Sequence, residues 1–184
     1  AASDVYKRQI KYRGSLAKWD TSLLRLCFLK GFLQAAHDHA SYVNADQLAE
    51  SVGLHVAEDT DPGFTDYESA FKCCFKLKGK QFTIGGVVFS GPHPRITLIN
   101  DFVCELEASG TMLVTTNSDK PGMIGVIGVC LGKHQININQ FELGRNVRGG
   151  EAMAVISVDQ DISKDILDEL ISNDGIISVR KIVL

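Results

Sequence analysis

A short polar segment, residues 117–122 (NSDKPG), is the part of the chain best suited to hold a charged small molecule. It follows a predicted strand, residues 111–116, and leads into a predicted helix, residues 121–133. Pro121 fits the first helical position, and the backbone N–H groups from Gly122 onward would then favour a carboxylate at the positive end of the helix dipole. Asp119 either caps this helix or pairs with an ammonium group. The segment predicts a site for a zwitterion such as a free amino acid, with no catalytic residue.

Asn137 stands at the start of the next predicted strand, residues 135–143. Its side-chain amide offers both donors and an acceptor, so it could contribute to a polar site. An asparagine at a strand entry is also common for purely structural reasons. The residue pattern leaves both interpretations open.

The predicted helix, residues 121–133, has two different faces. One face is an apolar stripe, and the opposite face carries three glycines, which each cost a helix about 1 kcal/mol relative to alanine. The stripe consists of Met123, Val126, Ile127, Cys130 and Leu131, and the glycines are Gly125, Gly128 and Gly132. We predict that a partner subunit or the preceding domain packs on the glycine face, the alternative being that the glycines are merely tolerated.

The glycines of this helix do not predict a nicotinamide site. Gly122, Gly125 and Gly128 have GxxGxxG spacing and lack the first close glycine pair of the dinucleotide fingerprint. The hairpin signal at residues 149–150 also predicts that the strand over residues 151–158 runs antiparallel. We therefore expect no bound cofactor in this chain.

The order of predicted elements from Thr111 onward is strand, helix, strand, strand, helix, strand, which is the ferredoxin-like βαββαβ plan. The part from Ile10 to about residue 108 is predicted as a separate α+β domain, with a strand at residues 54–57 and a mobile loop at residues 59–65. The predicted fold class is therefore α+β, with domains at residues 10–108 and 109–184 and a boundary near residues 108–110.

Specific motifs now point to a family. The segments NSDKPGMIG, INI, LGR and GGEAMAVISVD resemble the ACT domain that ends D-3-phosphoglycerate dehydrogenases. The segments YRGSLAKWDTSLLRLCFLKGFLQ, YVNADQLAESVGLHVAE and GGVVFSGPHPRITLIN resemble the intervening, or allosteric-substrate-binding, domain of the long form of these enzymes. The resemblance covers nearly everything from Ile10 onward.

This resemblance implies a regulatory role in serine biosynthesis. ACT domains of the family bind L-serine at a subunit interface and lower activity, which places loop contacts at Asn117 and Asp119 and the contact of the adjacent subunit at Asn137. NAD belongs to the catalytic domains of the parent enzyme, which are expected to be missing from this chain. Two alternatives remain open: the regulatory part of an iron–sulphur L-serine dehydratase, and an interaction module that binds no ligand.

A second, anionic site is implied in some relatives, where basic residues of the intervening domain bind phosphate or a phosphorylated substrate. Only Arg95 stands at a matching position, while Phe102 and Glu107 occupy places where such relatives carry arginine. An acid beside an anion site repels its ligand, so we expect weak phosphate binding or none.

The composition excludes several classes of protein. The chain has 184 residues, 45% of them hydrophobic, and its net charge of −3 gives no electrostatic footprint for nucleic acid or a membrane surface. Five cysteines without a CxxC motif predict reduced thiols in a cytoplasmic protein. His37 and His39 lack a third ligand at a recognisable spacing, so no metal site is predicted.

The first nine residues receive a separate interpretation. The run DVYKRQ, residues 4–9, has no counterpart in the family pattern. We interpret residues 1–9 as a non-native segment on a truncated reading frame, the alternative being a disordered native terminus.

Overall fold

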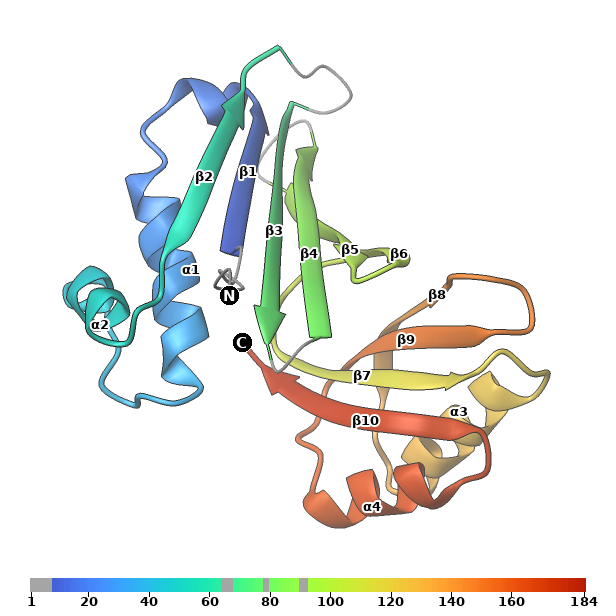
Figure 1. Cartoon of the computed structure of the whole chain (residues 1–184). Helices are drawn as coiled ribbons and strands as arrows, with labels where there is room; N and C mark the ends of the chain where they lie inside the picture. Colours follow the sequence, from blue (N-terminus) through green and yellow to red (C-terminus); the bar gives the residue numbers. More distant parts are fainter. Residues whose placement is uncertain (1–7, 64–67, 78–79, 90–92) are drawn as a thin grey trace, which may run out of the picture. The chain divides into compact units, whose positions relative to one another are not determined.

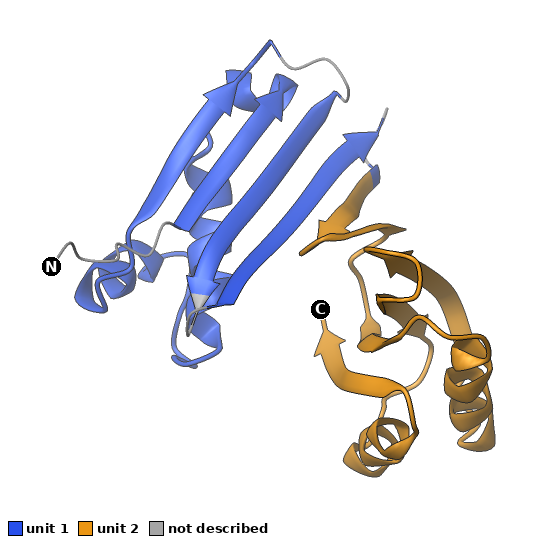
Figure 2. Cartoon of the chain, turned by 45° about the vertical axis from the view of Figure 1, so that its right-hand side comes forward, with its two compact units in different colours: residues 1–93 blue, residues 94–184 orange. Residues whose placement is uncertain are grey.

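The structure is a computed structural model that describes residues 8–63, 68–77, 80–89 and 93–184. The chain forms two compact units, Ala1–His93 and Pro94–Leu184, which are coloured separately in Figure 2 and are called here the first and the second unit. Within the described residues, no helix is long and apolar enough to span a membrane.

The first unit is an α+β structure in which two helices accompany a sheet (Figure 1). Its strands have the order β2-β1-β3-β4; β1 pairs in parallel with β2 and antiparallel with β3, which forms an antiparallel hairpin with β4. Phe28 of α1 packs against buried Ile10 and Tyr12 of β1. The elements are β1 (Arg8–Gly14), η1 (Ser15–Lys18), α1 (Ser22–Gln34), α2 (Ala45–Ser51), β2 (Val56–Asp61), β3 (Ser69–Leu77) and β4 (Lys80–Phe89).

Strand β1 begins inside the segment that was interpreted as non-native, an interpretation that stays a prediction. Arg8 and Gln9, predicted to belong to a non-native segment, are paired strand residues: Arg8 lies opposite Val56, and Gln9 lies opposite Cys74. The rest of the predicted segment, residues 1–7, lies outside the described residues.

The second unit contains the predicted βαββαβ order, which confirms the α+β fold class. Its sheet is antiparallel throughout, with strand order β10-β7-β9-β8. Before these elements come two further strands, of which β5 begins at the unit boundary. The elements are β5 (His93–Ile99), β6 (Phe102–Leu106), β7 (Thr111–Ser118), α3 (Met123–Lys133), β8 (Ile138–Arg145), β9 (Glu151–Val158), α4 (Lys164–Ser172) and β10 (Ile176–Val183).

Both faces of this second sheet are buried. Leu113 and Ile156 join residues of α3 and α4 in one core on the helix face. Met112 and Val155 point the other way and pack with Phe102 of β6 in a second core. Successive strand residues face opposite sides, so two covered faces explain the nearly continuous apolar run of β9.

The compact second unit starts earlier than the predicted ACT domain. Strands β5 and β6 belong almost entirely to it, whereas residues up to 108 were expected in the preceding domain. The domain boundary near residues 108–110 stays a prediction, because compactness alone does not define a family domain.

Candidate functional site

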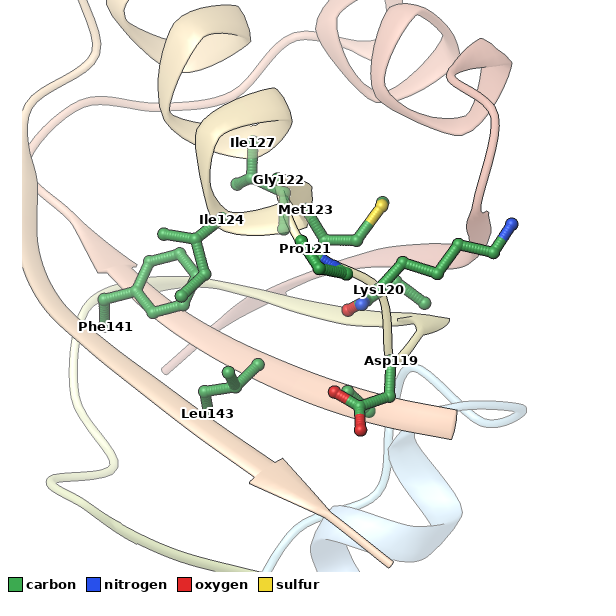
Figure 3. Close-up of a pocket in the computed structure, with 11 residues that line it drawn as sticks. Asp119, Lys120, Pro121, Gly122, Met123, Ile124, Ile127, Phe141 and Leu143 are labelled. Atoms are coloured by element: carbon green, nitrogen blue, oxygen red, sulfur yellow. The ribbon is translucent and has the colours of Figure 1, made fainter. Parts of the chain in front are cut away.

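The predicted zwitterion site coincides with a cavity of about 160 Å³ in the second unit. This volume is small beside the roughly 300–1,000 Å³ of pockets that bind drug-sized ligands, so it suits a small molecule. Figure 3 shows the loop before α3 and the side chains of β8 around the same space. The lining residues are Asn117, Asp119, Lys120, Pro121, Gly122, Met123, Ile124, Ile127, Phe141, Leu143 and Ala152.

Helix α3 begins two residues later than predicted, and this changes the entrance of the site. Gly122, with φ of 94°, is the N-cap, so Pro121 precedes the helix and does not occupy its first turn. Glycine readily adopts this left-handed conformation, which is not helical, so the helix begins at the next residue, Met123. No side chain caps α3 within the described residues, and its first backbone bond is donated by Val126 N–H to Gly122 O. The N–H groups of the first turn therefore remain available at the positive helix end.

Asp119 does not cap the helix. Its Oδ2 accepts a hydrogen bond of 2.8 Å from Gly149 N–H, and Arg145 Nη1 lies 3.5 Å from the same oxygen. Both contacts come from the hairpin between β8 and β9. The carboxylate side chain is 20% exposed and lines the cavity, so its negative charge is positioned beside the helix start.

Asn117 is the least satisfied polar residue of the site. It is 2% exposed, and its Nδ2 donates a 2.8 Å hydrogen bond to Ser118 O. Its Oδ1 is buried without a hydrogen-bond partner in the described part of the chain. A buried unpaired acceptor costs about 1–3 kcal/mol, so a ligand donor in the cavity would be favoured.

Sequence reasoning missed the apolar wall of the cavity. Phe141 and Leu143 of β8 lie across from Ile124 of α3, as Figure 3 shows. The alternation of Phe141, Glu142 and Leu143 places the two apolar side chains on one strand face, which was the available signal. The pairing that brings β8 to α3 could not be inferred from spacing alone.

Asn137, predicted to complete the site, is not in the cavity of its own chain. Its Nδ2 donates to Asp159 Oδ2 at 2.6 Å, and its backbone N–H donates to Gln160 Oε1 at 2.7 Å. These contacts hold it beside the end of β9. Its contribution from an adjacent subunit stays a prediction.

Arg95, the predicted anion-site residue, is engaged by an acid of the same unit. Its Nη1 lies 3.3 Å from Glu107 Oε2 and donates to Pro94 O at 3.1 Å. Phe102 is buried. A phosphate at Arg95 would have to compete with Glu107, so weak phosphate binding or none remains our expectation.

The structure is thus an α+β protein with a small cavity at the start of α3. Residues 1–100 match the protein family described as the D-3-phosphoglycerate dehydrogenase intervening domain. This match covers more than half of the chain, and the chain therefore belongs to that family. The matched range also includes the segment interpreted as non-native.

Whole-chain comparisons agree with this family. The chain is 32% identical over 178 residues to D-3-phosphoglycerate dehydrogenase of Bacillus subtilis, covering 95% of this chain and 34% of that protein. It is 31% identical over 178 residues to the Synechocystis enzyme of the same name, covering 96% and 32%. It is 29% identical over 166 residues to D-3-phosphoglycerate dehydrogenase 2, chloroplastic, of Arabidopsis thaliana, covering 82% and 26%.

The chain thus spans about a third of the length of these relatives. The family match and the names of the relatives favour the dehydrogenase over the serine dehydratase alternative.

Proposed function

We propose that this chain is the regulatory part of a D-3-phosphoglycerate dehydrogenase and that its second unit, an ACT domain, binds L-serine in the cavity at the start of α3. The observation that carries the proposal is Asn117 Oδ1, a buried acceptor without a partner among the described residues, at the wall of a cavity of about 160 Å³. An empty apolar pocket would not need such an acceptor.

The groups around the cavity match the three polar parts of serine. The uncapped first turn of α3, which borders the cavity, suits the α-carboxylate. Asp119 suits the ammonium group, and Asn117 Oδ1 can accept from the ammonium or the hydroxyl. The cavity volume of about 160 Å³ and the apolar side chains of Phe141 and Leu143 in its wall favour a small amino acid.

Thermal unfolding with and without L-serine tests the proposal. At about a hundred times the dissociation constant, serine should raise the free energy of unfolding by roughly 2.7 kcal/mol. Asp119→Asn keeps the shape of the side chain, removes its charge and should abolish most of this gain. Asp165→Asn, which removes an acid from the first turn of the other helix, α4, is the matched control and should leave the gain intact.

An unchanged melting temperature in saturating serine would contradict the proposal. An equal serine effect in Asp119→Asn and Asp165→Asn would also contradict the assigned role of Asp119.

We further propose that catalysis and NAD binding belong to the remaining two thirds of the parent enzyme. The isolated chain should therefore show no NAD-dependent oxidation of 3-phosphoglycerate. Enzymatic activity that copurifies with the chain through two orthogonal columns would refute this assignment.

A further inference from the structure

Three side chains with metal-binding atoms converge where the end of α3 meets α4. The Sγ of Cys130, a ring nitrogen of His134 and a carboxylate oxygen of Glu169 all lie within 4.8 Å of one another. His134 Nε2 is 2.8 Å from Glu169 Oε2. Cys130 is 5% exposed, while the side chains of His134 and Glu169 are 31% and 34% exposed.

The two helices supply this cluster in a way the sequence does not reveal. Cys130 and His134 are four residues apart, one helical turn, so they face the same side of α3. Glu169 comes from α4, 35 residues beyond His134. The sequence-based expectation of no metal site considered only His37 and His39, because ligands on two helices have no fixed spacing.

We propose that Cys130, His134 and Glu169 form a zinc site that ties α3 to α4. Thiolate, imidazole and carboxylate are the three ligand types that Zn²⁺ uses in proteins. Zinc–ligand distances of about 2.0–2.3 Å place neighbouring donor atoms of a tetrahedral site about 3.5 Å apart. The three donor atoms, all within 4.8 Å of one another, are close to that spacing.

A fourth coordination position is accessible beside the cluster. Cys130 and Glu169 also line a cavity of about 310 Å³, which Val129 and Asn173 border. A water molecule there would complete a three-ligand site, as in zinc sites that keep one position open. The cavity also provides a route by which the ion can enter.

Lys133 is the charged group that opposes a cation at this place. Its Nζ lies 2.9 Å from Glu169 Oε1 and its side chain is 64% exposed, so it holds the carboxylate oxygen that the cluster does not use. Such a contact orients the carboxylate and leaves Oε2 for the metal, in the manner of an outer-shell partner. Cys130 would bind zinc as a thiolate, so zinc binding should release a proton.

Equilibrium dialysis with Zn²⁺ and absorption spectroscopy with Co²⁺ test the proposal on the whole chain. The wild type should bind one zinc ion, and Co²⁺ should give a thiolate charge-transfer band. Cys130→Ser should remove that band. Cys130→Ser and His134→Gln should each weaken zinc binding at least about a hundredfold, which exceeds the usual effect of changing a residue that only contacts a metal ligand. Circular dichroism verifies that both variants are folded.

Two matched controls separate this site from adventitious binding. Cys27→Ser removes an exposed thiol, and His39→Gln removes one ring of the neighbouring pair His37 and His39. Both controls should keep the zinc affinity and the cobalt band of the wild type. Equal zinc affinity in Cys130→Ser and the wild type, a cobalt complex without the charge-transfer band, or loss of zinc only in the controls would overturn the proposal.

Discussion

Asn117 owes its unusual environment to its place in the register of β7. Leu113, Thr115 and Asn117 share the face of the sheet that α3 and α4 cover, and Thr115 and Asn117 are 0% and 2% exposed. Thr115 Oγ1 donates to Ala154 O at 3.5 Å, whereas no donor in the part of the chain that the structure describes reaches Asn117 Oδ1. A polar residue at an apolar register position is a cost that a ligand can offset.

The buried thiol of Cys104 gives a prediction about alkaline pH. Burial raises the pKa of Cys104 from 9.0 to about 11, so the folded state favours the neutral thiol. The contribution of the buried neutral thiol to the free energy of unfolding is fully present below pH 9. It falls by about 2 kcal/mol as the pH rises toward 11. Urea unfolding between pH 8 and about 11 measures it, and Cys104→Ala should flatten the pH dependence by that amount. Cys27→Ala, at an exposed thiol, should leave the slope unchanged; equal slopes in all three proteins would contradict the prediction.

At the residue scale, the sequence could group only those residues of the candidate site that are neighbours along the chain, and their binding role stays a prediction. Asn117, Asp119, Pro121 and Gly122 were predicted as one site and do line one cavity. The partners of Asp119 were missed because Gly149 lies 30 residues away and reaches Asp119 only through the β8–β9 hairpin.

At the scale of elements, β8 depends on a close approach to β6. A Cβ added at Gly144 would lie 2.7 Å from Val103 O and 3.2 Å from Phe102 Cβ. The first distance is shorter than real Cβ contacts, and the obstacle is backbone, so one of the two strands would have to move. Gly144 therefore allows the β5–β6 segment to cover the second sheet.

Gly144→Ala should lower the free energy of unfolding by about 1–3 kcal/mol, the usual cost of overpacking. Gly31→Ala, in α1, is the matched control, because its added Cβ meets open space and a helical alanine should gain about 1 kcal/mol over glycine. Chemical denaturation of both variants measures the difference. A Gly144→Ala protein as stable as the wild type would show that β6 does not lie against β8 in solution.

Element boundaries followed the sequence best where a long apolar run follows a clear turn signal. Strand β9 was predicted at residues 151–158 and has those bounds. Strand β2 was expected at residues 54–57 and instead extends over Val56–Asp61, into the predicted loop, of which residues 64 and 65 lie outside the described residues. Its acidic end is supported by ion pairs: Arg13 with Asp59 at 2.6 Å and Arg25 with Glu58 at 3.5 Å. Such pairs arise from tertiary structure and leave no periodic signal.

For the whole molecule, the extent of the second unit has a direct test. A fragment of residues 94–184 keeps β5 and β6 over Met112, Met153 and Val155, whereas a fragment of residues 109–184 exposes this face. We expect the longer fragment to unfold cooperatively and the shorter one to be less stable by several kcal/mol, at about 1.5–3 kcal/mol per large side chain uncovered. Urea titrations followed by circular dichroism compare the two. Equal stability of the two fragments would support the predicted domain boundary near residues 108–110.

From the outer face of α3 we predict that the molecule associates with a second copy. Ile124 and Val129 are 54% and 74% exposed, and a Cβ added at Gly125, Gly128 or Gly132 would meet nothing within 4 Å. A face this flat lets another backbone approach closely, and a symmetric dimer would also allow Asn137 of one chain to reach the site of the other.

Sedimentation in saturating serine should show at least a dimer. Gly128→Leu should weaken it at least tenfold, while Gly31→Leu, a glycine of α1 with equally open surroundings, should not. A wild-type monomer at high concentration, or equal association of the two variants, would exclude this face as the interface.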